Sequence, residues 1–207
     1  KISKVKKIKI SVMIPTYNQS TYILDAVKSA LAQDYDNKEV IVSDDSTDDL
    51  TFLVLKEYID SRKIIYYKNK KNKGRVQNYR RLLYEYSSGD YVINLDGDDY
   101  FIDDSYLLNA AKIIKNNPDI VLVYAKQKAL RINETFLENS KYIENFINGN
   151  DLFMKVFDEN FLIPHLSSIY KRDVAMEIDF YREDISSSDW ESIFRLIVEN
   201  KVCYFDK

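Results

Sequence analysis

The stretch Tyr91–Tyr100 places three carboxylates directly after a short apolar run, which predicts a buried strand that ends in an acidic turn. Only Gly97 separates Asp96 from Asp98 and Asp99, and a glycine lets the backbone turn tightly. Carboxylates held this close repel one another, and each raises the pKa of its neighbours. A hard divalent cation with oxygen ligands would remove that repulsion. The alternative is a plain acidic turn, since Asp and Gly are common turn residues.

The composition of the 207-residue chain is that of a globular protein with a sizeable core, because 45% of its residues are apolar and 30% are charged. A net charge of -3 gives no reason to expect nucleic acid as a partner. The single cysteine, Cys203, excludes an internal disulfide. We expect a cytoplasmic protein, because no apolar run approaches membrane-spanning length and no signal peptide is visible. The first residue is Lys1 and not Met, so we expect a fragment or a processed product.

Glycine and histidine usage narrows the chemistry further. The four glycines are too far apart for a Walker loop or a dinucleotide fingerprint, so a metal and basic side chains would have to neutralise any bound phosphates. His165 is the only histidine, which excludes a multi-histidine zinc site. A Ser-His-Asp hydrolase would have to use His165, and the sequence contains no Gly-x-Ser-x-Gly motif to support one.

Strands and helices alternate in the first two thirds of the sequence. The hydrophobic spacing predicts strands at 10–14, 40–42, 63–67, 91–93 and 120–130, and helices at 22–33, 48–58, 76–86 and 104–116. This order predicts an α/β fold with a mostly parallel sheet and helices on both faces. The second half is less regular: 135–148 has weak periodicity, and we expect helices near 152–157 and 190–197 with strands near 166–170 and 202–205.

Polar turns follow three of the predicted strands, at 15–18, 44–48 and 96–99. Ligands of such sheets bind beyond the carboxyl ends of the strands. These turns are therefore expected to lie together at one rim, which favours a binding site over unrelated acidic turns.

The motifs at this rim resemble those of the family 2 glycosyltransferases. The matching stretches are Val-Met-Ile-Pro-Thr-Tyr-Asn at 12–18, Glu-Val-Ile-Val-Ser-Asp-Asp-Ser-Thr-Asp at 39–48, Gly-Asp-Tyr at 89–91 and Leu-Asp-Gly-Asp-Asp at 95–99. The resemblance covers nearly the whole chain. It implies a Rossmann-like GT-A fold and inverting transfer of a sugar from a nucleotide-diphosphate donor, UDP-linked, to a hydroxyl group. The acceptor would be a glycan or a lipid-linked or protein-linked sugar, in bacterial cell-envelope polysaccharide biosynthesis.

The resemblance also implies which residues bind the donor. This set consists of Pro15, Thr16, Tyr17, Asn18, Asp44, Asp45, Arg75, Asp96 and Gly97. Asp45 matches the residue that accepts a hydrogen bond from the base, while Asp44 could instead hold the loop. Asp98 matches the direct ligand of Mn²⁺ or Mg²⁺, and Asp96 matches the carboxylate on the ribose side or the metal side, so both are expected at the metal. The alternatives are a packed surface aromatic for Tyr17 and a solvated charge for Arg75.

The acceptor side matches more loosely. Ser188-Asp189-Trp190-Glu191 precedes a predicted helix, as the catalytic acidic motif does in the family, so Asp189 is the expected general base. The usual Glu-Asp pair is absent there, and Glu183-Asp184 competes for the role. Asp189 as a plain helix N-cap is the other alternative. Trp190, Glu191 and His165 are expected on the acceptor-side wall, although His165 could equally be a structural histidine.

We expect one catalytic domain over 1–207, with a nucleotide-sugar half at 10–130 and an acceptor half at 131–207. The family usually continues with a segment that closes over the donor, so the chain is expected to be truncated at its C-terminus. Peripheral contact with the inner face of a membrane is also expected, while the oligomeric state is not predicted.

Two other classes of function remain open. One is a non-catalytic nucleotide-sugar-binding module. The other is a sugar nucleotidyltransferase, disfavoured because the turn at 15–18 has neither glycine nor positive charge.

Overall fold

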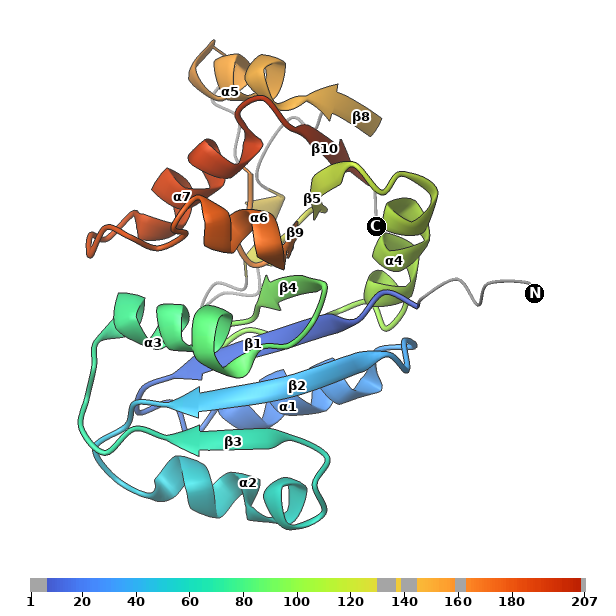
Figure 1. Ribbon diagram of the computed structural model, residues 1–207. Helices are drawn as coiled ribbons and strands as arrows, with labels where there is room; N and C mark the ends of the chain where they lie inside the picture. The colour runs from blue at the N-terminus through green and yellow to red at the C-terminus, as the bar shows by residue number, and fades with distance from the viewer. Residues whose placement is uncertain (1–6, 130–136, 139–144, 159–162, 206–207) are drawn as a thin grey trace.

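The computed structural model describes residues 7–129, 137–138, 145–158 and 163–205, which form an eight-stranded sheet and its covering helices. The strand order is β3-β2-β1-β4-β9-β5-β10-β8 (Figure 1). The bounds are β1 Ile10–Thr16, β2 Lys38–Asp44, β3 Ile65–Lys68, β4 Tyr91–Asn94, β5 Ile120–Tyr124, β8 Asn145–Asn148, β9 Ser168–Lys171 and β10 Lys201–Tyr204. Two further short strands, β6 Lys128–Ala129 and β7 Leu137–Glu138, pair with each other.

Most neighbouring strands of this sheet are parallel, as predicted. β1 pairs in parallel with β2 and β4, β2 with β3, and β5 with β10. β9 is antiparallel to both β4 and β5, and β8 is antiparallel to β10 at the edge. β9 belongs to the second half of the sequence and lies between two strands of the first half. The two predicted halves therefore share one sheet.

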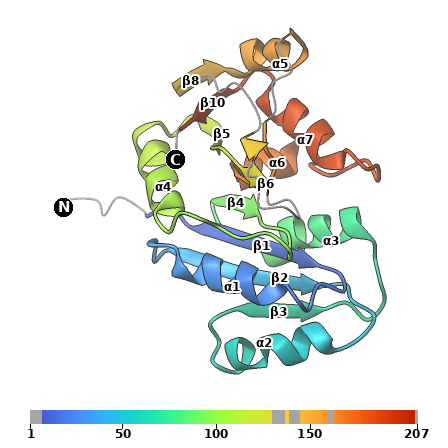
Figure 2. The ribbon, with the colours of Figure 1, turned by 180° about the vertical axis from the view of Figure 1, so that it is seen from behind.

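Helices cover both faces of the sheet because its strands are apolar on both sides. The bounds are α1 Ile23–Ala32, α2 Leu50–Asp60, α3 Arg75–Arg81, α4 Tyr106–Asn116, α5 Gly149–Asp158, α6 Arg172–Glu177 and α7 Ser188–Ile197. Val12 and Ile14 of β1 pack into the core with α1 and α4, whereas Met13 packs with α3 and α7. Figures 1 and 2 show α1 and α3 on opposite faces of the sheet.

The structure differs from the sequence-based expectations at several element ends. The strand predicted at 120–130 ends at Tyr124, and the helix predicted at 76–86 is α3 followed by a π-helical turn at Leu82–Tyr86. The spacing did not predict β8 or α6. Most of 135–148, the stretch with weak periodicity, lies outside the described residues. No helix in the described part of the chain is both long and apolar enough to cross a lipid bilayer.

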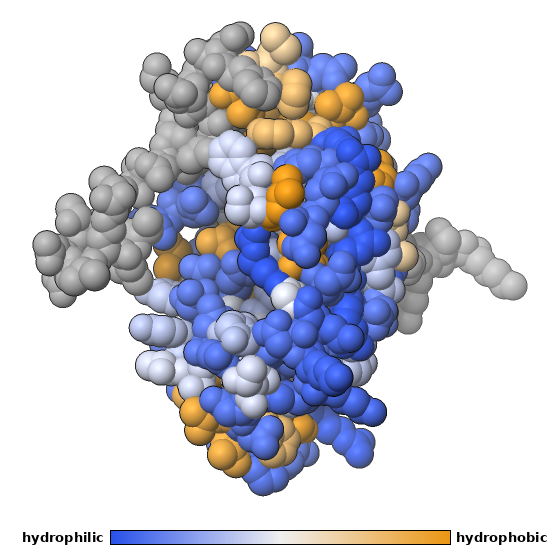
Figure 3. Space-filling model, turned by 90° about the vertical axis from the view of Figure 1, so that its left-hand side faces the viewer, coloured by the Kyte–Doolittle hydropathy of each residue, from blue (hydrophilic) through white to orange (hydrophobic). Residues whose placement is uncertain are grey.

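The parallel strands end together at one rim of the sheet. Thr16 at the end of β1 is paired with Asp44 at the end of β2, and Met13 is paired with Asn94 at the end of β4. Figure 1 shows β1, β2 and β3 pointing towards the same side of the molecule, and Figure 3 views that side. The surface there is largely hydrophilic.

Candidate active site

The acidic turn packs directly on the turn that follows β1. The backbone N–H of Gly97 donates to the carbonyl of Pro15 at 3.1 Å, and the N–H of Leu95 donates to the carbonyl of Met13 at 2.8 Å. A Cβ atom on Gly97 would lie only 2.8 Å from Oγ1 of Thr16. Glycine is therefore required here for close packing of the two turns, which brings the carboxylates against the 15–17 turn.

Asp96 is held by two hydrogen-bond donors. The Tyr79 hydroxyl lies 3.0 and 3.2 Å from its two carboxylate oxygens, and Nδ2 of Asn94 donates to Oδ1 at 2.8 Å. Burial raises the pKa of the Asp96 carboxyl, although His165 and these two hydrogen bonds act in the opposite direction. Neither Tyr79 nor Asn94 was predicted from the sequence as a site residue.

Asn94 is fully buried in β4, and its Oδ1 has no hydrogen-bond partner among the described residues. A buried polar atom left in this way costs about 1–3 kcal/mol. Rotating the amide would turn its oxygen towards the Asp96 carboxylate, which would repel it. The carboxylate therefore determines the orientation of this amide.

Asp98 and Asp99 face different cavities. Asp98 is exposed and faces the same cavity as Asp96, whereas Asp99 faces a second cavity on the other side of the turn. Burial, together with the charges of Asp96 and Asp98, raises the pKa of Asp99 to about 7. This shift agrees with the mutual repulsion expected of clustered carboxylates.

The cavity at the rim has a volume of about 570 Å³, and we call it the Tyr17 cavity. It is lined by Pro15, Thr16, Tyr17, Gln19, Asp45, Asn72, Gly74, Arg75, Asn78, Tyr79, Asp96 and Asp98. Most of the predicted donor-binding residues are among them. The exceptions are Asn18, Asp44 and Gly97.

Asn18 and Asp44 join the turns behind the Tyr17 cavity. The N–H of Asn18 donates to Oγ of Ser46 at 2.8 Å, which ties the turn after β1 to the turn after β2. The fully buried Asp44 carboxylate accepts hydrogen bonds from the Tyr66 hydroxyl at 2.6 Å and from Nζ of Lys68 at 3.1 Å. Both residues therefore support the cavity from behind and are not part of its wall.

Asp45 lines the cavity, but its carboxylate also holds the loop 69–74 that forms one wall. It accepts hydrogen bonds from the backbone N–H of Lys73 at 2.8 and 2.9 Å, and from that of Gly74 at 2.9 Å. Nδ2 of Asn69 donates to it at 2.8 Å. Both oxygens are thus used by the loop, and the hydrogen bond to a nucleobase stays a prediction.

Arg75 is exposed, as the alternative from the sequence expects, but its guanidinium also makes contacts within the protein. Its guanidinium donates to the carbonyls of Ile185 at 3.1 Å and Ser186 at 2.5 Å, and it lies over the Tyr79 ring at 5.7 Å from the centroid. Because Ile185 and Ser186 precede α7, Arg75 joins the start of α3 to the segment that carries Asp189.

A smaller cavity of about 220 Å³, which we call the His165 cavity, adjoins the Tyr17 cavity. It is lined by Arg75, Tyr79, Asp96, Gln127, Ile163, Pro164, His165, Leu166, Asp189 and Trp190. Arg75, Tyr79 and Asp96 line both cavities. The predicted base and two of the predicted acceptor-side residues therefore lie next to the predicted donor site.

The positions of Asp189 and Asp184 separate the two candidates for the base. Asp189 lies in the first turn of α7 and faces the His165 cavity with Asp96. The N-cap of α7 is Ser187, so Asp189 does not occupy the capping position. Asp184 instead lines a hollow with Arg75 and Ile185, to which neither Asp96 nor Asp189 contributes. The geometry favours Asp189.

Glu191 does not line the His165 cavity. Its carboxylate accepts hydrogen bonds from Nε of Arg195 at 2.6 Å and pairs with Arg182 at 3.1 Å. The hydrogen bond from Arg195 is the main reason why the pKa of Glu191 is lowered. Glu191 follows Asp189 by two residues in α7, and residues two apart project from different sides of a helix. This placement corrects the expectation that Glu191 faces the acceptor.

His165 is nearly buried and has both a structural contact and a face on the cavity. One ring nitrogen, Nε2, lies 2.7 Å from the Tyr181 hydroxyl. Burial lowers the pKa of the imidazole, although the charges of Asp96 and Asp189 oppose this shift. His165 thus lines the cavity and also makes a structural contact, so its position is compatible with both roles that the sequence left open.

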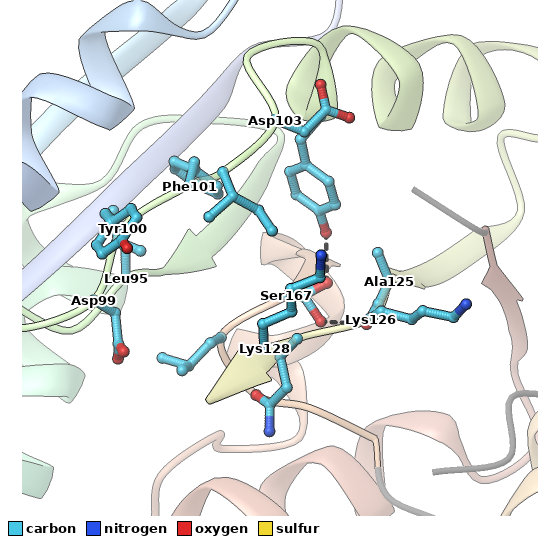
Figure 4. A pocket seen from close by; sticks show the side chains of 13 residues that line it. Leu95, Asp99, Tyr100, Phe101, Asp103, Ala125, Lys126, Lys128 and Ser167 are labelled. Atoms are coloured by element: carbon cyan, nitrogen blue, oxygen red, sulfur yellow. Dashed lines mark hydrogen bonds between the residues drawn. The ribbon is translucent and has the colours of Figure 1, made fainter. Parts of the chain in front are cut away.

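A third cavity, of about 300 Å³, begins at Asp99, and we call it the Tyr100 cavity. Figure 4 shows Asp99 and Tyr100 on one side of it and Lys128 and Ser167 on the other. Gln127 and Leu166 line both this cavity and the His165 cavity, so the two adjoin. An extended ligand could therefore reach from Asp189 to Tyr100.

The carboxylates of the turn fit a divalent cation only if a ligand supplies further oxygens. No group of three or more His, Cys, Asp or Glu side chains in the described ranges is arranged to hold a metal ion. Asp96 and Asp98 share the Tyr17 cavity, and Mg²⁺ is commonly bound by one or two carboxylates together with substrate phosphates. The residues therefore fit a cation that arrives with a diphosphate.

Comparison with known proteins identifies the family. The sequence profile described as "Glycosyl transferase family 2" matches residues 11–179. An Escherichia coli protein named UDP-Glc:alpha-D-GlcNAc-diphosphoundecaprenol beta-1,3-glucosyltransferase WfgD is 32% identical over 178 residues, which are 84% of this chain and 66% of that protein. An uncharacterized glycosyltransferase of Rickettsia bellii is 34% identical over 143 residues, 69% of this chain and 19% of its own length. The chain thus spans about a fifth of that relative.

Solved structures share the fold. Staphylococcus aureus TarS 1-349 in complex with UDP-GlcNAc aligns with a TM-score of 0.73 and 23% identity, over 97% of this chain and 59% of that one. The mannosyltransferase PcManGT from Pyrobaculum calidifontis, in complex with GDP-Man and Mn2+, aligns with a TM-score of 0.73 and 16% identity, over 98% and 56%. These likenesses show that the chain has the GT-A fold, and the profile match shows that it belongs to glycosyltransferase family 2.

Proposed function

We propose that the chain catalyses inverting transfer of a sugar from a UDP-linked donor to a hydroxyl group of a glycan or glycoconjugate, assisted by Mn²⁺ or Mg²⁺. The observation that carries the proposal is the position of Asp96. It lines both the Tyr17 cavity, with the 15–17 turn and Asp98, and the His165 cavity, with Asp189. A donor and an acceptor in these two cavities would meet at this carboxylate.

The donor would occupy the Tyr17 cavity, with its base near the 15–17 turn and Asp45. Relatives support a UDP donor, since WfgD is named for UDP-Glc and TarS was solved with UDP-GlcNAc. PcManGT, which was solved with GDP-Man, shows that proteins of this fold also take another base. The nucleotide is therefore part of what the experiment below must test.

Asp96 and Asp98 would hold the divalent cation at the diphosphate. When bound there, the cation would neutralise the negative charge that grows on the departing nucleoside diphosphate. Arg75, at the junction of the two cavities, adds a positive charge close to the same place.

Asp189 would act on the acceptor. Its carboxylate would accept a hydrogen bond from the acceptor hydroxyl and take its proton as the oxygen attacks the anomeric carbon. Attack from the face opposite the leaving group inverts that carbon. General-base assistance of this kind contributes about 10²–10⁴-fold to a rate.

The acceptor would extend from the His165 cavity towards the Tyr100 cavity, which adjoins it through Gln127 and Leu166. WfgD is named for a sugar on diphosphoundecaprenol, and TarS for poly(ribitol-phosphate). By analogy we infer a lipid-linked or polymer-linked glycan acceptor of the bacterial cell envelope, met at the inner face of the membrane.

Release of UDP from UDP-glucose and UDP-N-acetylglucosamine, measured with Mn²⁺ and with EDTA, tests this function. A short-chain lipid diphosphate carrying N-acetylglucosamine serves as acceptor, and GDP-mannose controls for the base. Release that requires both the metal and Asp98 supports the proposal. Tight binding of the donors without any release would contradict it and would indicate a non-catalytic nucleotide-sugar-binding module.

A further inference from the structure

We infer that Tyr79 is a positioning residue, whose hydroxyl acts with the Asn94 amide to orient the Asp96 carboxylate for a cation bound together with a nucleoside diphosphate. The inference rests on the proposed function, because that function puts the cation at Asp96. Neither Tyr79 nor Asn94 was assigned a role from the family motifs.

The contacts on Asp96 come from two different elements. The Tyr79 hydroxyl, from α3, lies 3.0 and 3.2 Å from the two carboxylate oxygens. Nδ2 of Asn94, from β4, donates to Oδ1 at 2.8 Å. Two donors on one carboxylate fix both its direction and the rotation of its plane. Substitution of such a partner of a metal ligand typically lowers the metal affinity by about 10–100-fold.

The Tyr79 side chain is held rigidly. It is 3% exposed, and its ring lies 5.2 Å from the Tyr181 ring and 6.0 Å from that of His165. The Arg75 guanidinium covers another side of it. Packing on several sides fixes the hydroxyl against Asp96, and Tyr79→Phe would remove this hydroxyl while leaving the ring contacts in place.

Asn94 makes its contact with Asp96 although its own side-chain oxygen gains no partner from this arrangement. Its amide donates to Asp96, while its own Oδ1 is left buried and without a partner among the described residues. A strand residue with an apolar side chain would avoid that loss. The contact with Asp96 is therefore what the amide contributes at this position.

Tyr170→Phe is the matched control for Tyr79→Phe. Tyr170 is also a fully buried tyrosine, and its hydroxyl lies 3.3 Å from that of Tyr181. It lines neither the Tyr17 cavity nor the His165 cavity. Both variants therefore lose one buried hydroxyl, but only Tyr79→Phe loses a contact with Asp96.

The test is calorimetric titration of UDP, with GDP in parallel, in EDTA and in Mn²⁺, and of Mn²⁺ at saturating nucleotide. We expect Tyr79→Phe to bind Mn²⁺ about 10-fold or more weakly, while its affinity for UDP in EDTA stays within about twofold of the unchanged protein. Tyr170→Phe should match the unchanged protein in both titrations. Asn94→Ala removes the other donor and should weaken Mn²⁺ binding in the same way, which provides a second variant.

Unaltered Mn²⁺ affinity in folded Tyr79→Phe or Asn94→Ala would overturn the inference. Equal losses in Tyr79→Phe and Tyr170→Phe would also overturn it, because they would show a purely structural effect of a buried hydroxyl. Failure of the proposed function has a different signature: the unchanged protein would then show no effect of Mn²⁺ on nucleotide affinity. That result would remove the metal site and this inference with it.

Discussion

Asp45→Ala is the substitution for which the structure predicts two linked effects. The carboxylate accepts two backbone N–H groups, from Lys73 and Gly74, and an amide N–H from Asn69. Hydrogen bonds to charged groups contribute about 1.5–3 kcal/mol each. Water can replace the carboxylate at Lys73 and Gly74, which are exposed, but not at Asn69, which is buried.

We therefore expect Asp45→Ala to lower the free energy of unfolding by about 2–3 kcal/mol. For a chain of this size that corresponds to a drop in melting temperature of about 4–12 °C. We expect UDP affinity to fall by about 1–3 kcal/mol, because the wall of the Tyr17 cavity loosens and any hydrogen bond from the base is lost.

Limited trypsin digestion reports on loosening of the cavity wall and is insensitive to the loss of a hydrogen bond from the base. The 69–74 loop contains Lys70, Lys71 and Lys73, so a loosened loop offers trypsin three cleavage sites. Faster cleavage at these lysines, together with weaker UDP binding by calorimetry, is the expected result. Asp48→Ala is the control, because its Oδ1 accepts from the N–H of Leu50 and it does not line the cavity. Unchanged digestion and unchanged UDP affinity in Asp45→Ala would show that this carboxylate neither holds the 69–74 loop nor supports UDP binding.

Two further substitutions give expectations for binding and for stability. Asp98→Ala should abolish the effect of Mn²⁺ on donor affinity. The fold should stay intact, because Asp98 is exposed. Calorimetry that shows an unchanged effect of Mn²⁺ would count against Asp98 as a metal ligand. Glu39→Gln should lower the free energy of unfolding by about 1–3 kcal/mol at pH 7. Burial alone would raise the pKa of Glu39. Hydrogen bonds from Lys9, Ser11 and Ser88 outweigh the effect of burial and lower this pKa. Because its pKa is lowered, Glu39 stabilises the folded state at pH values above its unfolded-state pKa of 4.5, and this contribution is lost as the pH falls. Urea unfolding should therefore show a smaller effect of Glu39→Gln at low pH. The control Asp60→Asn should show no effect, because Asp60 is exposed.

The placement of the acidic turn could be predicted from the sequence because it depends on topology alone. An apolar run followed by Asp96, Gly97 and Asp98 indicates a strand that ends at the rim of a parallel sheet. β1 lies between β2 and β4, so their turns had to meet. The close approach of Gly97 to Thr16 then completes the site.

Residues that act through tertiary packing could not be found in this way. Tyr79 follows the apolar spacing of α3, and nothing in that spacing shows that its hydroxyl reaches Asp96. Asn94 did give a signal, since a polar residue at the end of an apolar strand must find a partner when buried. The insertion of β9 between β4 and β5 depends on a pairing over about eighty residues, which local patterns do not contain. Glu191 could have been excluded, because it lies two residues from Asp189 on one helix.

Single-turnover transfer by Asp189→Asn tests most directly whether donor and acceptor meet at Asp96 with Asp189 as the base. The substitution keeps the size of the side chain but removes the proton acceptor. We expect transfer from UDP-linked sugar to the lipid-linked N-acetylglucosamine acceptor to fall by about 10²-fold or more, with UDP and Mn²⁺ affinities unchanged. Asp184→Asn should transfer at the normal rate, because Asp184 lines a hollow to which neither Asp96 nor Asp189 contributes. Full activity in Asp189→Asn and lost activity in Asp184→Asn would show that Asp189 is not the base and that Asp184 is.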